Sequence, residues 1–210
     1  PIIHISTDYV FDGEKPSPYV ETDPTAPQGV YGRSKYEGEL AVADANPHHV
    51  ILRTAWVYSE YGSNFVKTML RLARKKPELR VVADQNGNPT HAGDLAEAIV
   101  KIAGKLVSGT DTESLWGVYH LAGEGETTWH GLAKHIIDCA ARLGMPPIPV
   151  IPITTAEFPT PAKRPANSRL DCSKATATFD VTLPRWQDSV ERCVRTLIDN
   201  QEQSKTGELS

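Results

Sequence analysis

The stretch Ile2-Ile-His-Ile-Ser6 is dominated by β-branched residues and predicts a buried strand. The strand runs directly into Thr7-Asp8-Tyr9. The hydroxyls of Ser6 and Thr7 and the carboxylate of Asp8 therefore stand where this strand ends and a loop begins. Side chains of this kind commonly cap turns, and they also bind ligands. On these residues alone both roles stay open.

Predicted strands and helices alternate along the rest of the chain. The strands are expected at 50–54, 79–83 and 117–121, and the helices at 30–45, 65–75, 93–107, 129–143, 173–179 and 186–200. Residues 84–90 are predicted to form turns only, and the proline-rich stretch 146–165 an extended loop with at most short strands. The alternation predicts an α/β fold with an open parallel sheet. Such sheets bind ligands at the carboxyl ends of their strands, here the loops after Ser6, Thr54 and Ala83.

Composition and charge exclude several classes of protein. Apolar residues make up 40% of the 210, too many for a disordered chain. The 22 basic and 26 acidic residues give a net charge of −4, without the basic block that charge-driven nucleic-acid binding needs. No apolar run approaches the roughly 18 residues of a membrane span, and no secretory leader is visible. The three cysteines have no CxxC spacing and no histidine near them at ligand spacing, so we expect reduced thiols, a cytoplasmic protein and no metal site.

A second set of reactive side chains opens the helix predicted at 30–45. Tyr31-Gly-Arg-Ser-Lys35 places a phenol and an ammonium four residues apart, on one face of this helix. A lysine ammonium beside a phenol favours the phenolate, so such a tyrosine can exchange a proton near neutral pH. It can give that proton to a carbonyl oxygen as hydride reaches the carbon, and a nearby hydroxyl can hold the same oxygen. The spacing alone is a weak signal, but here it follows a strand that ends in Ser-Thr.

Five segments taken together resemble one enzyme family. They are Ser6-Thr-Asp-Tyr-Val-Phe-Asp-Gly13, Val30-Tyr-Gly-Arg-Ser-Lys-Tyr-Glu-Gly-Glu39, Arg53-Thr-Ala-Trp-Val-Tyr58, Asn64-Phe-Val-Lys-Thr-Met-Leu70 and Arg164-Pro-Ala-Asn-Ser-Arg-Leu170. The segments are similar to those of the dTDP-4-dehydrorhamnose reductases, a branch of the extended short-chain dehydrogenase/reductases. The resemblance extends over about residues 1–198. It implies a Rossmann-type parallel sheet with a small substrate-binding α/β region in the C-terminal part.

The resemblance also implies a reaction and a role for each site residue. The family uses NADPH or NADH to reduce the C4 keto group of dTDP-4-dehydro-L-rhamnose to dTDP-L-rhamnose, for polysaccharide biosynthesis. By motif, Tyr31 is the expected proton donor, and Lys35 is expected to assist it and to hold the nicotinamide ribose. Thr7 is expected to bind the C4 oxygen, and Asp8 and Trp56 to contact the sugar or the ring beside it. Trp56 at a strand end also fits a buried structural aromatic.

The start of the chain and its glycines bear on the domain organisation. Pro1 already stands at the edge of the first predicted strand, and the only Gly-x-Gly pair, Gly123-Glu-Gly125, lies far downstream without a third glycine. We therefore expect the N-terminal strands of the Rossmann domain and its phosphate loop to be missing, and this chain alone to be inactive. Residues 1–60 are the expected remainder of that domain, 61–200 a substrate-binding region interleaved with its last elements, and 201–210 a disordered tail.

Three alternatives to a reductase are compatible with the same fold. Nucleotide-sugar 4,6-dehydratases usually carry Asp-Glu after the threonine, whereas Tyr9 follows Asp8 here, which favours the reductase. A non-catalytic subunit, like the regulatory subunit of methionine adenosyltransferase, would not need the reactive set Thr7, Tyr31 and Lys35. Another nucleotide-sugar dehydrogenase/reductase of the same family is the third. The expected partners are a nucleotide sugar and a second copy of the chain in a homodimer, with neither nucleic acid nor membrane.

Overall fold

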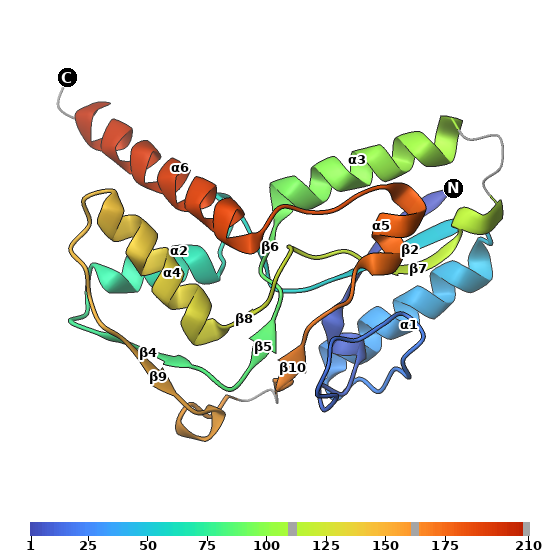
Figure 1. Cartoon of the computed structure of the whole chain (residues 1–210), viewed down its shortest axis with the longest axis horizontal. Coiled ribbons are helices and arrows are strands. Elements are labelled where there is room, and N and C mark those ends of the chain that lie inside the picture. The colour runs from blue at the N-terminus through green and yellow to red at the C-terminus, as the bar shows by residue number, and fades with distance from the viewer. Residues whose placement is uncertain (109–112, 161–163, 208–210) are drawn as a thin grey trace.

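The computed structural model describes residues 1–108, 113–160 and 164–207, the last seven of these and residue 113 by their backbone only. Figure 1 shows two groups of elements side by side. One group is a three-stranded parallel sheet with helices packed on it, and the other is a set of helices with a two-stranded parallel sheet. The predicted α/β fold with parallel strands is thereby confirmed.

The three-stranded sheet carries the candidate site at one of its ends. Its strands are β1 (Ile2–Thr7), β2 (His49–Thr54) and β7 (Gly117–His120), in the order β1-β2-β7 and parallel throughout. The helices packed on it are α1 (Val30–Ala45), α3 (Ala92–Ser108) and α5 (Ser173–Phe179). These bounds lie within one residue of the predicted ones at most ends, because glycine, proline and asparagine mark most of the boundaries.

The two faces of this sheet differ because neighbouring side chains of a strand point in opposite directions. Ile3 and Ile5 lie on the apolar face, in a cluster that joins β2 and β7 to α3 and α5. His4 and Ser6 lie on the other face, against Gly38 and Glu39 of α1. The alternation in the first strand therefore decides which helix covers which face.

A second core fills the helical group. Its elements are α2 (Phe65–Ala73), α4 (Trp129–Arg142), α6 (Trp186–Gly207), β4 (Leu79–Val82) and β9 (Val150–Ile153). Asn64 Oδ1 accepts from the Lys67 amide at 3.2 Å and Thr128 Oγ1 from the Gly131 amide at 3.0 Å, so each side chain caps the helix that follows it. The most buried aliphatic side chains here contribute about 1.5–3 kcal/mol each. They include Val66, Leu70, Leu132, Ile136, Val190 and Val194.

Residues 79–91 differ from their prediction in two ways. β4 does not join the β1-β2-β7 sheet but pairs with β9, so the loop after Ala83 is not at the carboxyl edge of that sheet. Residues 84–90, predicted as turns only, contribute β5 (Asn86–Gly87) and the start of β6 (Thr90–His91). Strands of two residues are too short to show an alternating pattern, and their partners lie far away in the chain. The partners are β3 (Val57–Tyr58) for β6, and β10 (Asn167–Ser168) and β8 (Thr127–Thr128) for β5.

The last helix also exceeds its prediction. α6 continues to Gly207, so the disordered tail expected from residue 201 is replaced by helix as far as 207, and residues 208–210 lie outside the described part. Glutamine, glutamate and lysine in 201–205 are good helix formers, which explains the extension. Among the helices of the described residues, none is long and apolar enough to cross a membrane.

Candidate active site

The carboxyl end of β1 forms a tight, buried turn. Thr7 Oγ1 accepts from the Tyr9 amide at 3.2 Å and donates to Asp8 Oδ1 at 2.8 Å. Thr7 is thus the cap of the short 3₁₀ turn Asp8–Val10, the capping role that the sequence left open. Asp8 is 4% exposed, and one of its carboxylate oxygens, Oδ2, has no hydrogen-bond partner among the described residues. Burial raises the pKa of Asp8 to about 6, although hydrogen bonds from Ser168 and Thr7 oppose the rise.

The start of α1 lies directly against this turn. Gly32 makes the approach possible, because a Cβ there would stand 2.2 Å from the Tyr9 carbonyl oxygen. The neighbouring Tyr31 is 58% exposed and meets the Tyr9 ring edge-on, with centroids 5.8 Å apart. One turn later, Lys35 Nζ donates to the Ile5 carbonyl at 2.6 Å. Both predicted catalytic side chains of α1 therefore stand at the carboxyl end of β1, with Tyr31 open to solvent.

A buried ion pair between β2 and α1 lies next to the turn after β1. Arg53 of β2 donates from Nε and from Nη2 to the Glu39 carboxylate, at 2.9 and 2.6 Å, and both side chains are at most 5% exposed. The Ser6 hydroxyl donates to the same carboxylate. Two-point pairing of this kind fixes orientation as well as distance. The Glu39 carboxylate thus ties α1 to β2 through Arg53, and to β1 through Ser6, the residue just before Thr7.

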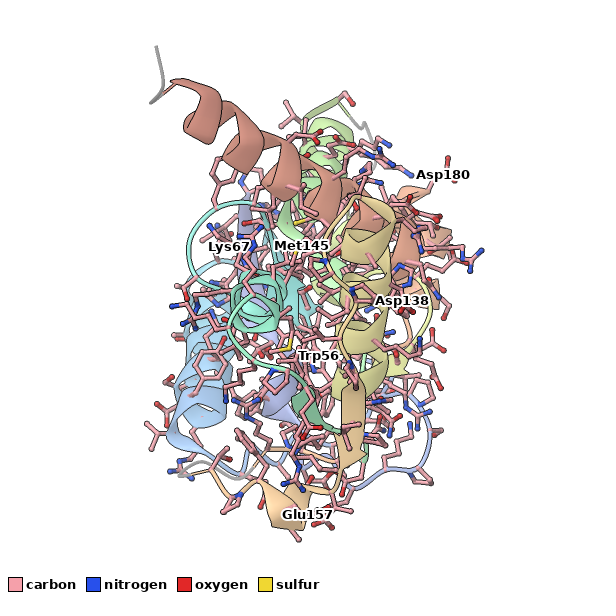
Figure 2. The ribbon with its side chains drawn as sticks, turned by 90° about the vertical axis from the view of Figure 1, so that its left-hand side faces the viewer. Trp56, Lys67, Asp138, Met145, Glu157 and Asp180 are labelled. Carbon is pink, nitrogen blue, oxygen red and sulfur yellow. The ribbon has the colours of Figure 1, made fainter. Side chains whose placement is uncertain are left out.

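Trp56 lies near the middle of the molecule, beyond the end of β2 (Figure 2). Its φ of 47° is in the left-handed region, which a bulky residue rarely adopts. Its indole stacks on Trp129 with centroids 3.6 Å apart and planes within 9°, and it lies against Gly87, where a Cβ would be 2.4 Å from the ring. Trp56 is half-buried and contacts two of the apolar clusters. A strained backbone held by such packing is typical of a functional site.

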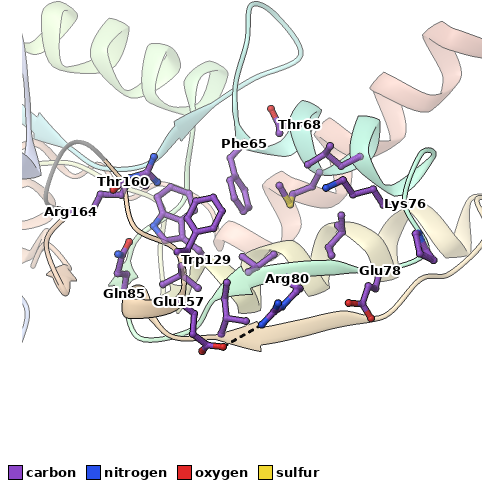
Figure 3. A pocket seen from close by; sticks show the side chains of 18 residues that line it. Phe65, Thr68, Lys76, Glu78, Arg80, Gln85, Trp129, Glu157, Thr160 and Arg164 are labelled. Atoms are coloured by element: carbon purple, nitrogen blue, oxygen red, sulfur yellow. Dashed lines mark hydrogen bonds and ion pairs between the residues drawn. The ribbon is translucent and has the colours of Figure 1, made fainter.

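A cavity of about 710 Å³ opens beside Trp129, one member of this stack, and Figure 3 shows the side chains that line it. Phe65 and Trp129 form an aromatic wall with centroids 4.7 Å apart, so Trp56, Trp129 and Phe65 make a continuous aromatic surface. Lys76, Arg80 and Arg164 supply cationic groups around the same space, and Glu157 accepts from Arg80 at 3.3 Å. A second, more open cavity of about 890 Å³ shares Phe158, Thr160 and Arg164 with the first.

The structure unites most of the predicted site residues. Thr7, Asp8, Tyr31 and Lys35 meet at the carboxyl end of β1, and Trp56 follows β2, which pairs with β1 as far as Thr54. Sequence reasoning did not assign five residues to the site, all from later in the chain than Trp56. They are Phe65, Gly87, Trp129, Arg164 and Ser168. Phe65, Arg164 and Ser168 fall in two of the five segments quoted for the resemblance, which is the signal that could have indicated them.

Comparison with known proteins identifies the family. Residues 1–198 match the family model described as RmlD substrate binding domain. The chain belongs to this family. A match over nearly the whole chain includes both the turn after β1 and the cavity beside Trp129.

Two relatives with the same enzyme name cover most of this chain. The chain is 54% identical over 198 residues to a dTDP-4-dehydrorhamnose reductase of Sinorhizobium fredii, which covers 94% of this chain and 67% of the relative. It is 43% identical over 195 residues to the reductase of the same name from Salmonella typhimurium, covering 91% and 64%. The chain therefore spans about two thirds of the length of the curated relatives that it matches.

Solved structures with the same name share the fold. A dTDP-4-dehydrorhamnose reductase from Clostridium acetobutylicum superposes with a TM-score of 0.83 at 40% identity, covering 93% of this chain and 65% of that one. A Bacillus anthracis reductase in complex with NADP gives 0.81 at 39% identity, covering 91% and 64%. The Rossmann-type sheet that the sequence indicated is confirmed by these neighbours.

Proposed function

We propose that this chain holds a dTDP-sugar and supplies the proton donor for reduction of its C4 keto group, from dTDP-4-dehydro-L-rhamnose to dTDP-L-rhamnose. The observation that carries the proposal is the position of Tyr31 and Lys35 at the carboxyl end of β1. Trp56 connects the apolar cluster of this turn to Trp129 in the wall of the cavity. The relatives named dTDP-4-dehydrorhamnose reductase, at 43–54% identity, support this choice of reaction.

Tyr31 is the proposed proton donor because its ring is open to solvent at the edge of the turn. Reduction of a ketone places a hydride on carbon and leaves charge on oxygen, which the phenol neutralises by giving up its proton. The Lys35 ammonium, held on the Ile5 carbonyl, supplies positive charge on the same side of α1. Thr7 and Asp8 are proposed to contact the sugar, although Thr7 Oγ1 is used within the turn here and would have to redirect its proton.

The cavity beside Trp129 is proposed to hold the nucleotide. A thymine ring offers a flat apolar face, which suits the surface formed by Phe65 and Trp129. A diphosphate offers negative oxygens, which suit Arg80 and Arg164 on the polar side of the cavity. Trp56 stands between this cavity and the turn after β1, where the sugar would lie.

The proposed hydride source is NADP(H) or NAD(H), which supplies the two-electron reduction when bound. The described residues that fit one end of such a cofactor are Tyr31 and Lys35, whose hydroxyl and ammonium can bond ribose hydroxyls. Support comes from the Bacillus anthracis neighbour, whose structure is described as a complex with NADP.

The cytoplasmic location of the protein and its assembly as a homodimer stay predictions.

Product analysis tests the proposed reaction. An enzyme that carries this sequence should consume NADPH when dTDP-4-dehydro-L-rhamnose is added, and deuterium from labelled cofactor should appear at C4 of the sugar. A non-catalytic subunit would bind the sugar nucleotide without consuming cofactor, and a different nucleotide-sugar reductase would turn over another sugar faster. Either result would refute the proposal.

A further inference from the structure

A cluster of metal-ligating side chains lies away from the candidate active site. Glu60, His91 and Cys193 present one ligand atom each, and these atoms all lie within 4.8 Å of one another. His91 Nε2 is 3.1 and 3.2 Å from the two Glu60 carboxylate oxygens. Among the residues that the structure describes, this is the one group of three such side chains.

The three ligands come from three separate elements. Glu60 follows β3, His91 ends β6 and Cys193 is in α6. Cys193 is fully buried, whereas Glu60 and His91 are 19% and 11% exposed. Lys67 of α2, labelled in Figure 2, holds the Glu60 segment by donating to the Glu60 carbonyl at 2.9 Å. The cluster is thus partly exposed to solvent at Glu60 and His91, whereas Cys193 is buried in the core.

Two further side chains, Asp94 and Tyr58, lie beside the cluster. Asp94 Oδ1 lies 3.6 Å from His91 Nδ1, on the side of the ring away from Glu60, and Ser189 and Arg192 of α6 donate to Asp94. In this structure the Asp94 amide donates to the same Nδ1 at 3.4 Å. With Nε2 on a metal, Nδ1 would instead carry the proton and face the Asp94 carboxylate. Tyr58 is 2% exposed, and its hydroxyl has no hydrogen-bond partner among the described residues.

The unpartnered Tyr58 hydroxyl is an independent indication of a missing ligand. Its ring lies 5.5 Å from the His91 ring, centroid to centroid, so Tyr58 stands beside the cluster. A buried hydroxyl without a partner destabilises the fold, and a metal-bound water would remove this cost by accepting its hydrogen bond. Three protein ligands and one water complete a tetrahedral site.

We propose that Glu60, His91 and Cys193 bind one Zn²⁺, with a water molecule near Tyr58 in the fourth position. Thiolate and imidazole together favour zinc over calcium and magnesium, which prefer oxygen ligands. The Glu60 carboxylate and a Cys193 thiolate supply two negative charges, which balance the charge of the ion. The proposed site departs from the sequence-based expectation of no metal, which found no motif because the three ligands are 31 and 102 residues apart.

The bound ion would link the segment after β3, the end of β6 and helix α6. β3 follows Trp56 directly, and α2 begins at Phe65, so the segment that carries Glu60 connects two members of the aromatic surface. A metal tie from this segment to β6 and α6 would hold the cavity wall in place. The ion takes no part in the proposed reduction.

Cobalt substitution tests the site. After chelator treatment, the purified protein should bind one Co²⁺ per chain, with a sulfur-to-cobalt charge-transfer band and strong tetrahedral visible bands, and Zn²⁺ should displace it. Cys193→Ser should abolish the sulfur band. Cys139→Ser is the matched control, because Cys139 also lies 3.5 Å from a histidine, His135, and its loss should leave the band unchanged.

Glu60→Gln covers the case in which Cys193→Ser fails to fold. This partly exposed side chain can change without opening the core, and the variant should bind Zn²⁺ at least tenfold more weakly while its melting temperature without metal stays close to that of the parent. Zn²⁺ should raise the melting temperature of the parent more than that of the variant. The proposal is wrong if no sulfur band forms at one equivalent of Co²⁺, if Cys139→Ser removes it, or if Glu60→Gln binds as tightly as the parent.

Discussion

Asp8→Asn should remove a pH dependence of stability that the fold creates at the end of β1. The carboxyl is 4% exposed, and its burial raises the pKa from 3.8 to about 6 in the folded chain. Between these two values the folded state binds more protons than the unfolded state. Stability therefore falls as the pH rises from about 4 to about 6 and stays lower above it.

The magnitude follows from the size of the shift. A difference of about 2 pKa units corresponds to about 3 kcal/mol, at 1.36 kcal/mol per unit. Asparagine keeps the shape of the side chain and can still accept at Oδ1 from Thr7, but it does not titrate. Part of this change falls below pH 4, where the unfolded carboxyl begins to ionise. The difference in unfolding free energy, variant minus parent, should therefore increase by about 2.4 kcal/mol from pH 4 to pH 7.

Urea denaturation of both proteins at a series of pH values measures this difference. Asp12, Asp84 and Asp171 have a lowered pKa through hydrogen bonds and so contribute the opposite slope, but they are common to both proteins and cancel. Burying the amide can also cost a free energy that does not depend on pH. Such a cost changes the difference in unfolding free energy equally at every pH and leaves its pH dependence unchanged. A difference that stays constant from pH 4 to pH 7 would show that Asp8 is not held in a desolvated site.

Three further substitutions examine separate parts of the account. In a full-length enzyme that carries this sequence, Tyr31→Phe should lower kcat by about 10²- to 10⁴-fold with little change in sugar-nucleotide binding, and turnover near that of the parent would remove the phenol from the mechanism. Glu39→Gln should cost about 3–5 kcal/mol in thermal or urea unfolding, because it leaves the buried Arg53 guanidinium without its countercharge; a loss below 1 kcal/mol would contradict the buried pair. Gly87→Ala should cost about 1–3 kcal/mol and weaken sugar-nucleotide binding, because its Cβ would displace the Trp56 indole; unchanged tryptophan fluorescence and binding would show that the ring adapts freely.

Local sequence signals predicted the elements of this fold well where the chain marks their ends. α1 has its predicted bounds because Gly29 precedes it and Asn46-Pro47 follows it, and α2 starts where Asn64 can cap it. The hydroxyls after β1 and the Tyr31–Lys35 pair were visible for the same reason, since each is a pattern of neighbouring residues.

Contacts between distant segments could not be predicted in this way. Ser168 reaches Asp8 across 160 residues, and Trp129 stacks on Trp56 across 73, and neither pair leaves a periodic pattern. β4 was assigned to the wrong sheet because its own residues resemble any buried strand, and only its pairing with β9 decides its place. The sequence therefore indicated one wall of the site and missed the cavity beside it.

Isothermal titration calorimetry with dTDP-L-rhamnose tests most directly the central claim, that the turn after β1 and the cavity beside Trp129 form one sugar-nucleotide site. The product should bind once per chain, Trp129→Ala should weaken binding of both dTDP and dTDP-L-rhamnose at least tenfold, and Tyr31→Phe should leave both affinities nearly unchanged. Binding that is absent in the folded protein, or that Trp129→Ala does not alter, would contradict the account.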